Sequence, residues 1–306
     1  MERVIIGSRG SALALWQTEH VIEQLRRVWP DRQFTIEKIK TEGDQVLDVP
    51  LASIGSRGLF VKEIENALIS GRVDLAVHSL KDLPSQLTPG LTLAAISKRE
   101  DVRDVLVSRD NQTLDELPPG AHVGTSSPRR AAQIMAYRPD LQVINLRGNL
   151  DTRLRKATTA QYDAVVVAAA GVIRLGLQER ITQYLPMSIC VPAIGQGALA
   201  IEARAEDEEL ILLVAPLDDA DVRASVTAER SFMRALGGGC QAPAGAYGRA
   251  EGQRLEIEAV VATPDGTRVM RERLAGARDD AERIGQELAL SMLQKGAAEI
   301  LAGSKG

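Results

Sequence analysis

The sequence has few of the residues that build a disulfide framework or a zinc centre. Two cysteines, Cys190 and Cys240, and three histidines occur among 306 residues. There is no CxxC pair and no histidine-rich tract, so we expect no structural zinc site and no bound metal. Aromatic residues make up only 3% of the chain, so the cores must depend on Val, Ile, Leu and Ala.

Long apolar segments and an excess of positive charge are also missing. The N-terminus, MERVIIGSRGSALALWQ, lacks the charged region and apolar run of a signal peptide. No stretch of about 18 uncharged apolar residues occurs that would span a membrane. The net charge of −4 argues against a nucleic-acid partner, because such proteins usually carry a basic excess. We therefore expect a cytoplasmic protein that binds neither membranes nor nucleic acid.

The first two-thirds of the chain alternates short apolar runs with helical patterns. Strands are expected at 3–7, 34–41 and 73–80, with a helix at 58–71. A similar series follows residue 104, with strands at 104–108, 121–124, 141–148 and 162–171 and helices at 125–137 and 149–161. This alternation favours α/β architecture, with mostly parallel sheets covered by helices on both faces.

The last third has a different pattern. An amphipathic helix at 219–236 precedes three expected strands, at 244–250, 253–263 and 267–276, and a final helix at 279–301. The PDG sequence at 264–266 is typical of a turn between adjacent strands. The C-terminal region is therefore predicted to be an α+β domain with a three-stranded antiparallel sheet.

Arginines and small polar residues gather at the expected strand ends and helix starts. They are Arg9, Ser11, Thr125, Ser126, Ser127, Arg129, Arg130, Arg147, Arg153, Arg155 and Arg174. In open α/β sheets ligands bind at the carboxyl ends of strands, and arginine side chains and helix N-termini both suit anions. Any one of these arginines could be a solvated surface charge, but the whole set predicts a ligand with several anionic groups.

Asp82 is a candidate for chemistry in the segment HSLKDLPSQ, where a strand delivers Ser79, Lys81 and Asp82 into a sharp turn. Such a carboxylate can stabilise a developing cation or carry protons. From spacing alone, an Asx-turn residue that bonds nearby backbone N–H groups is an equally good interpretation.

The two cysteines have contrasting surroundings. Cys240 follows three glycines in LGGGCQAPAG, which is a poor place for a packing residue. It suits a nucleophile or a covalent anchor, and no histidine base accompanies it. Cys190 lies between Ile189 and Val191 and is expected to be an inert core residue.

Eight segments, in order, resemble the porphobilinogen deaminase (hydroxymethylbilane synthase) family. They are GSRGSALALWQ, RGLFVKEIE, DLAVHSLKDLP, VGTSSPRRAAQ, NLRGNLDTRLRK, AAAGVIRLG, PAIGQGALAIE and LGGGCQAPAG, and they cover the chain essentially from end to end. The resemblance implies a monomeric enzyme of tetrapyrrole biosynthesis. It would join four porphobilinogen molecules into hydroxymethylbilane and release four ammonia molecules. It also implies a dipyrromethane cofactor, held by a thioether to Cys240.

The resemblance further implies a role for each matched residue. Asp82 would be catalytic, stabilising the cation formed when ammonia leaves. The cofactor would be held by Cys240 with Ser79, Lys81, Asp82, Thr125, Ser127, Arg129, Arg130 and Arg147. The substrate and the growing chain would be held by Arg9, Ser11, Arg57, Phe60, Ser126, Arg147, Arg153, Arg174 and Gln196. Arg57 stands where the family pattern has lysine, and an arginine fork is not equivalent to a lysine point charge.

For the fold, the resemblance implies two lobes like those of periplasmic binding proteins, with mixed, mostly parallel sheets. Residues 1–97 and 198–216 would form lobe 1, residues 98–197 lobe 2, and residues 217–306 the C-terminal domain carrying Cys240. The catalytic cleft would lie between the lobes. Because the same fold serves non-catalytic anion-binding proteins, such a binder is the alternative. A simple binder would need neither Cys240 nor Asp82.

Overall fold

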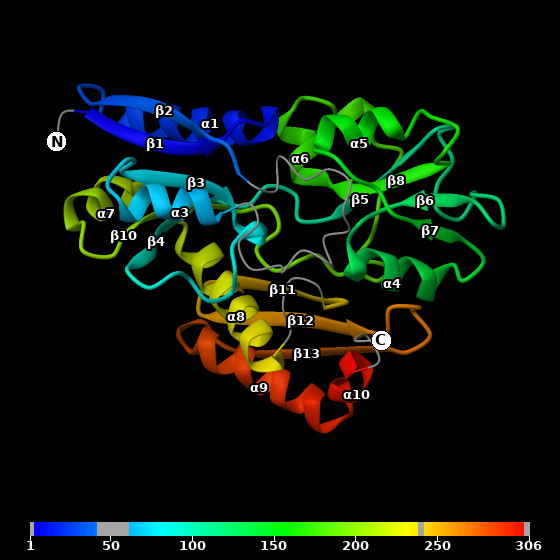
Figure 1. Cartoon of the computed structure of the whole chain (residues 1–306). Coiled ribbons are helices and arrows are strands. Elements are labelled where there is room, and N and C mark those ends of the chain that lie inside the picture. Colours follow the sequence, from blue (N-terminus) through cyan, green and yellow to red (C-terminus); the bar gives the residue numbers. More distant parts are fainter. Residues whose placement is uncertain (1–2, 42–60, 238–241, 303–306) are drawn as a thin grey trace. The chain divides into compact units, whose positions relative to one another are not determined.

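The computed structural model describes residues 3–41, 61–237 and 242–302. Within these ranges the strands form two five-stranded sheets and one three-stranded sheet (Figure 1). The chain divides into two compact units. Unit 1 comprises Met1–Glu100 and Gly197–Arg223, and unit 2 comprises Asp101–Gln196 and Ala224–Gly306.

The sheet of unit 1 has the strand order β2-β1-β3-β10-β4. Its strands are β1 (Arg3–Arg9), β2 (Gln33–Ile39), β3 (Leu75–Ser79), β4 (Leu91–Ile96) and β10 (Leu199–Arg204), and its helices are α1 (Ala12–Val28), α3 (Lys62–Ile69) and α7 (Glu208–Val214). β1 runs parallel to β2 and β3, whereas β10 runs antiparallel to β3 and β4. Side chains alternate along β1, so Ile6 packs in a core with Leu25 of α1, and Ile5 packs against the core that holds Ile64 of α3. Helices therefore cover both faces.

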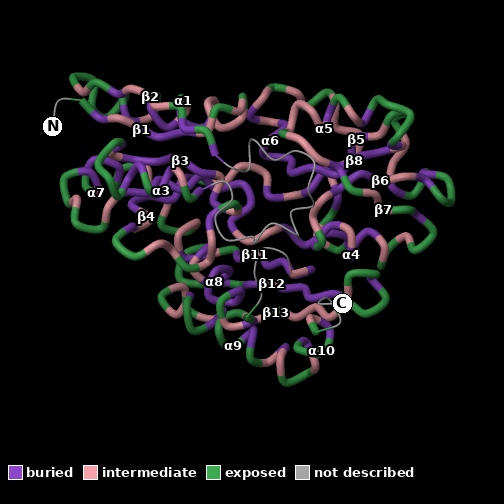
Figure 2. The backbone as a smooth tube through the Cα atoms, in the orientation of Figure 1, coloured by how far each residue is buried: buried purple, intermediate pink, exposed green. Residues whose placement is uncertain are grey.

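The five-stranded sheet of unit 2 has the order β7-β6-β8-β5-β9. Its strands are β5 (Asp104–Ser108), β6 (His122–Gly124), β7 (Gln142–Ile144), β8 (Ala164–Ala168) and β9 (Gln183–Tyr184), and its helices are α4 (Pro128–Tyr137), α5 (Leu150–Lys156) and α6 (Ala169–Arg174). β6 runs parallel to β7 and β8, and β5 runs antiparallel to β8 and β9. β8 is buried along its whole length (Figure 2), as its sequence AVVVA predicts for a strand covered on both faces.

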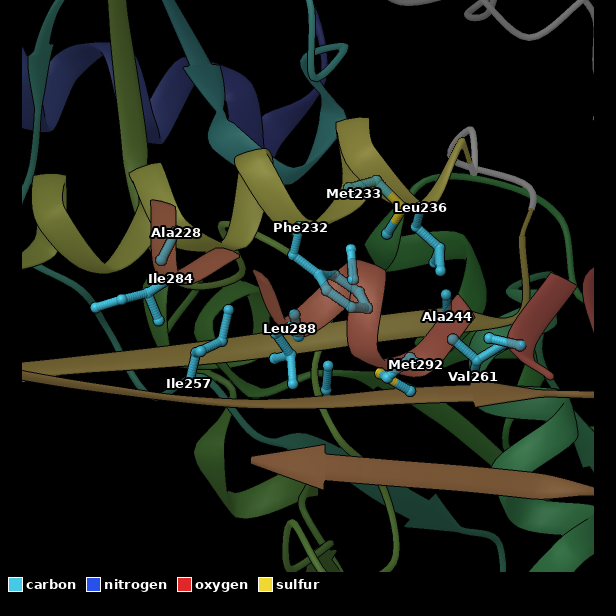
Figure 3. Close-up of a cluster of buried hydrophobic side chains, with 14 of the residues drawn as sticks. Ala228, Phe232, Met233, Leu236, Ala244, Ile257, Val261, Ile284, Leu288 and Met292 are labelled. Carbon is cyan, nitrogen blue, oxygen red and sulfur yellow. The ribbon is translucent and has the colours of Figure 1, made fainter. Parts of the chain in front are cut away.

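Unit 2 also contains the three-stranded antiparallel sheet. It is formed by β11 (Ala244–Glu251), β12 (Arg254–Ala262) and β13 (Val269–Ala277). Its helices are α8 (Ala220–Leu236), which belongs to unit 2 from Ala224 onward, α9 (Ala281–Gln294) and α10 (Ala297–Ala302). Phe232 of α8 and Leu288 of α9 belong to one apolar core with Ile257 and Val261 of β12 (Figure 3). The helices thereby bury one face of this sheet.

These sheets confirm the predicted fold class, two mixed α/β sheets with a C-terminal three-stranded antiparallel sheet. Several expected elements differ in extent. The strand expected at 162–171 is Ala164–Ala168, and helix α6 begins at Ala169. The helix expected at 149–161 ends at Lys156. The strand predicted at 141–148 is only Gln142–Ile144. The helix predicted at 279–301 is broken, because Gly296 adopts a left-handed conformation (φ 101°) that ends α9 before α10 begins. In the described ranges, no helix is long and apolar enough to cross a membrane.

Candidate active site

Two parallel strands of unit 1 bring predicted site residues to one edge of their sheet. Gly7 of β1 pairs with Ala76 of β3, and the two strands end at Arg9 and Ser79. Ser11 follows β1 and caps α1, since its hydroxyl accepts a hydrogen bond from the backbone N–H of Ala14 at 3.3 Å. The strand ends and the start of α1 thus lie together, as the sequence predicts.

The turn after β3 presents Asp82 to solvent. Leu80 is buried, and its backbone N–H donates to the carbonyl of Ala198 at 3.0 Å, which anchors the single turn Leu80–Asp82. Ser79 is fixed by Gln17 of α1, whose Nε2 donates to the serine Oγ at 2.8 Å. Asp82 itself is exposed, so its carboxylate is accessible to a ligand.

Three parallel strands of unit 2 likewise end at a common edge. Thr125 follows β6 and donates its backbone N–H to Ile144, the last residue of β7, at 3.0 Å. Ser127 then caps α4, with Pro128 as the first helical residue. This start agrees with the sequence prediction, and it places the positive end of the α4 dipole at the sheet edge.

The segment after β7 carries Arg147 and Arg153 in a tight turn. Arg153 Nε donates to the Gly148 carbonyl at 2.8 Å, and Lys156 Nζ donates to the Arg147 carbonyl at 3.2 Å. Gly148 has φ 113°, and a Cβ there would lie 2.6 Å from Thr152 Cγ2. Only glycine suits this turn. Arg174, at the end of α6, is buried.

Arg129 and Arg130, both buried, are bound to Asp104, which the sequence analysis did not single out. Arg129 Nη1 donates to Asp104 Oδ2 at 2.8 Å. Arg130 donates to Asp104 Oδ1 from Nε at 3.0 Å and from Nη2 at 2.7 Å. Asp104 opens β5, opposite Ala168 at the end of β8, so the carboxylate lies at the same sheet edge as α4.

Charge governs the protonation of this cluster. Burial alone would raise the pKa of Asp104, but the two guanidinium groups outweigh it and hold that pKa well below its usual range. Asp104 in turn raises the pKa of Arg129, against the effect of burial. The carboxylate therefore stays ionised at neutral pH and favours the charged form of Arg129.

The segment between β9 and β10, which contains Cys190 and Gln196, is hydrogen-bonded to the same carboxylate. Gln196 Nε2 donates to Asp104 Oδ1 at 2.9 Å and to the Val102 carbonyl at 2.7 Å. The Cys190 thiol donates to Asp104 Oδ2 at 3.3 Å. Burial, reinforced by the charge of Asp104, raises the pKa of Cys190 to about 12, so the thiol is protonated. Its burial agrees with the prediction of an inert core residue.

The C-terminal sheet approaches this cluster through a glycine. A Cβ on Gly245 of β11 would lie 2.6 Å from the Pro192 carbonyl oxygen and 2.8 Å from Arg129 Cδ. Any side chain would push β11 away from Arg129. The predicted site residues Arg57, Phe60 and Cys240 lie outside the described residues.

Two successive parts of the sequence match two models of one family. Residues 4–212 match the porphobilinogen deaminase dipyrromethane cofactor-binding domain, and residues 224–294 match the porphobilinogen deaminase C-terminal domain. The chain belongs to the porphobilinogen deaminase family. The predicted family is thus confirmed, and the match includes its dipyrromethane-binding domain.

Relatives named porphobilinogen deaminase align with nearly the whole chain. That of Desulforudis audaxviator is 52% identical over 299 residues, covering 98% of this chain and 97% of the relative. That of Brevibacillus brevis is 49% identical over 298 residues, covering 97% and 96%. These matches favour a porphobilinogen deaminase over the alternative of a non-catalytic binder.

Solved structures with a similar course of the chain include two ligand-binding proteins. The methionine-binding protein MetQ has a TM-score of 0.44 and 14% identity, covering 71% of this chain and 89% of that one. The BenM effector-binding domain with benzoate has a TM-score of 0.43 and 14% identity, covering 72% and 90%.

Proposed function

We propose that this protein joins four porphobilinogen molecules into hydroxymethylbilane, with release of four ammonia molecules, on a dipyrromethane primer. The primer would be attached by a thioether to Cys240 and would supply the free pyrrole carbon that extends the chain. Two observations carry the proposal: an exposed carboxylate, Asp82, stands at the sheet edge of unit 1, and a row of arginines stands at the sheet edge of unit 2. Loss of ammonia creates a cation, and every pyrrole ring brings two carboxylates.

Asp82 would stabilise the positive charge that develops when ammonia leaves the substrate. An ionised carboxylate accepts hydrogen bonds only, so it would also hold pyrrole N–H groups in place. Its exposed position on an anchored turn supports this role, because Leu80 and Ser79 fix the backbone beside it. Such preorganised charge is often the largest catalytic contribution.

The arginines would bind the acetate and propionate groups of the substrate, the primer and the growing chain. In unit 1 these residues are Arg9 and Arg57, with Ser11, Ser79, Lys81 and Phe60 beside them in the family motifs. In unit 2 they are Arg129, Arg130, Arg147, Arg153 and Arg174, with Thr125, Ser126, Ser127 and Gln196 nearby in the sequence or at the same sheet edge. Guanidinium groups match carboxylates in two parallel hydrogen bonds, which supports this assignment.

The wider organisation is also a proposal. Lobe 1 would comprise residues 1–97 and 198–216, lobe 2 residues 98–197, and the C-terminal domain residues 217–306, with catalysis in a cleft between the lobes. The protein would act as a cytoplasmic monomer on its small substrate. The acidic net charge of −4 supports the absence of a nucleic-acid partner.

The proposed reaction is tested by its stoichiometry. Purified protein incubated with porphobilinogen should release one ammonia for each porphobilinogen consumed and form one hydroxymethylbilane for every four. The Asp82→Asn variant should lose this activity, whereas Asp140→Asn, which changes a carboxylate paired with Arg138 away from the sheet edge, should retain it. A protein that binds porphobilinogen without releasing ammonia would instead be a binder.

A further inference from the structure

Tyr162 is a fully buried side chain to which the proposed function gives no role. It lies just before β8 and belongs to the apolar core that also contains Leu146. Its hydroxyl donates a hydrogen bond to the Asn145 carbonyl at 2.8 Å. Asn145 follows β7 directly and begins the segment 145–149, here called the Arg147 loop because it carries that proposed carboxylate-binding residue. A core side chain therefore holds the backbone beside a site residue.

The tyrosine ring crosses the face of the sheet to reach this carbonyl. β7, β6 and β8 are neighbours in the sheet (Figure 1), and both β7 and β8 run parallel to β6. Tyr162 precedes the start of β8 and Asn145 follows the end of β7, so the two residues lie at opposite edges of the sheet. Between them, a Cβ on Gly124 of β6 would lie 2.7 Å from Tyr162 Cδ1 and 2.9 Å from Cε1. Any larger residue at this position would displace the ring.

Two further side chains hold the Arg147 loop from α5. Lys156 Nζ donates to the Arg147 carbonyl, and Arg153 Nε donates to the Gly148 carbonyl. Both donors belong to the helix that begins directly after the loop, so they fix the loop relative to that helix. Tyr162 fixes the loop relative to the sheet.

The hydroxyl is a dependable donor, and its bond has a consequence for the site. Burial raises the pKa of Tyr162, so the phenol keeps its proton at neutral pH. The backbone at Asn145 sets the direction in which the chain continues to Arg147. A guanidinium binds a carboxylate best when two N–H groups are aligned with its two oxygens, so a displaced loop would bind a carboxylate less well.

We propose that Tyr162 is a positioning residue for Arg147, acting through the Asn145 carbonyl, and that Gly124 provides the space that lets the tyrosine ring reach it. The inference rests on the proposed function and deepens it. Because the Tyr162 side chain is buried, it acts through the backbone and does not touch the ligand. Loss of its hydroxyl should loosen the Arg147 loop and weaken carboxylate binding, without changing the chemistry at Asp82.

The test compares two variants that lose the same kind of hydrogen bond. Tyr162→Phe removes the hydroxyl and keeps the ring. The matched control is Ser231→Ala in α8, since the buried Ser231 also donates its hydroxyl to a backbone carbonyl at 2.8 Å, that of Glu282. Both variants should therefore lose a similar amount of thermal stability. Full-length proteins carrying their cofactor are compared at a temperature at which thermal unfolding shows all of them to be folded.

Amide hydrogen exchange reports on the Arg147 loop without any need for catalysis. Peptides covering residues 145–149 should exchange at least about threefold faster in Tyr162→Phe than in wild type, and at the wild-type rate in Ser231→Ala. Peptides from unit 1 give the internal reference in each protein. Unchanged exchange at 145–149 in Tyr162→Phe would show that the hydroxyl does not hold the loop, and the proposal would be wrong.

Steady-state formation of hydroxymethylbilane tests the consequence for binding. In Tyr162→Phe the KM for porphobilinogen should rise about fivefold, as loss of one buried hydrogen bond predicts, while kcat changes by less than about twofold. Ser231→Ala should keep the wild-type KM and kcat. An unchanged KM in Tyr162→Phe, or an equal rise in both variants, would overturn the positioning role. If wild type itself releases no ammonia from porphobilinogen, the proposed function fails instead, and hydrogen exchange still decides whether Tyr162 holds the loop.

Discussion

The two five-stranded sheets have the same arrangement but place different residues at one equivalent position. Each has three neighbouring parallel strands followed by an antiparallel strand. In unit 1 the first residue of that antiparallel strand is Leu199, which pairs with Ser79. In unit 2 it is Asp104, which pairs with Ala168. Both residues are buried, so the same place holds an apolar side chain in one sheet and a carboxylate in the other.

This difference in residue type gives the two sheet edges different electrostatics. In unit 1 the nearby carboxylate, Asp82, is exposed and makes no ion pair within the described part of the chain. In unit 2 Asp104 is fully buried and shared by two arginines. One edge therefore offers a carboxylate to a ligand, whereas the other uses its carboxylate to hold cations in place.

Removing the buried carboxylate should have the largest effect on stability. Asp104→Asn should lower the free energy of unfolding by about 3–5 kcal/mol at pH 7, because it leaves two buried arginines without their counter-ion. The folded-state pKa of Asp104 is below its unfolded value, so this stability is present above about pH 4 and is lost as pH falls further. Denaturant unfolding of wild type and Asp104→Asn should show that the difference in their free energies of unfolding narrows from pH 7 to pH 3. A constant difference would contradict an ionised Asp104 paired with the two arginines.

Removing the exposed carboxylate should affect turnover instead. Asp82→Asn keeps the size of the side chain but removes the charge that would stabilise the cation, so hydroxymethylbilane formation should fall by roughly a hundredfold or more. Thermal unfolding should be nearly unchanged, since Asp82 is exposed. If Asp82→Asn turned over at near wild-type rate, Asp82 would not be catalytic. The proposed functional difference between Asp82 and Asp104 would then be wrong as well.

The arginines that are only partly buried should have intermediate effects. Arg9→Leu in unit 1 and Arg153→Leu in unit 2 each remove a proposed carboxylate contact at a partly exposed site. We expect about tenfold slower chain elongation, less than for a fully desolvated pair. Partly elongated enzyme complexes, separated by charge, should accumulate in both variants. Their absence would mean that one or both sheet edges do not hold the chain.

The smallest expected effect concerns the thiol that donates to Asp104. The pKa of Cys190 is raised to about 12 in the folded protein, whereas an unfolded thiol titrates near about 8.5. The unfolded chain therefore loses this proton first, and stability should fall as pH rises above about 9. Cys190→Ser should lack the part of the stability loss above about pH 9 that the thiol causes. It should be only modestly destabilised at pH 7. Identical alkaline profiles for the two proteins would contradict the buried, hydrogen-bonded thiol.

Local sequence patterns predicted the strand ends and helix starts well, because their signals are short. Ser127 and Pro128 mark the start of α4, and the apolar run at 164–168 marks a buried strand. The break at Gly296 was missed because a single glycine is often tolerated inside a helical pattern. Cys190 was correctly predicted to be buried from its apolar neighbours.

The role of Asp104 could not be predicted in the same way. An aspartate at the start of an apolar run is typical of an ordinary strand boundary. The partners of Asp104, Arg129 and Arg130, are 25 and 26 residues away in the sequence. Their meeting depends on the pairing of β5 with β8 and on the placement of α4, neither of which local spacing fixes. The sequence therefore predicted arginines for a ligand, whereas the structure adds the carboxylate that holds them.

The central claim is that a pyrrole primer is attached covalently to Cys240, and intact mass after incubation with porphobilinogen tests it most directly. Wild type and Cys190→Ser should each carry the added mass of two linked pyrrole units and form hydroxymethylbilane. Cys240→Ser should fold, since thermal unfolding reports mainly on the cores, but should carry no such mass and be almost inactive. An active Cys240→Ser variant, or a wild-type protein that never gains covalent pyrrole when given substrate, would contradict the account.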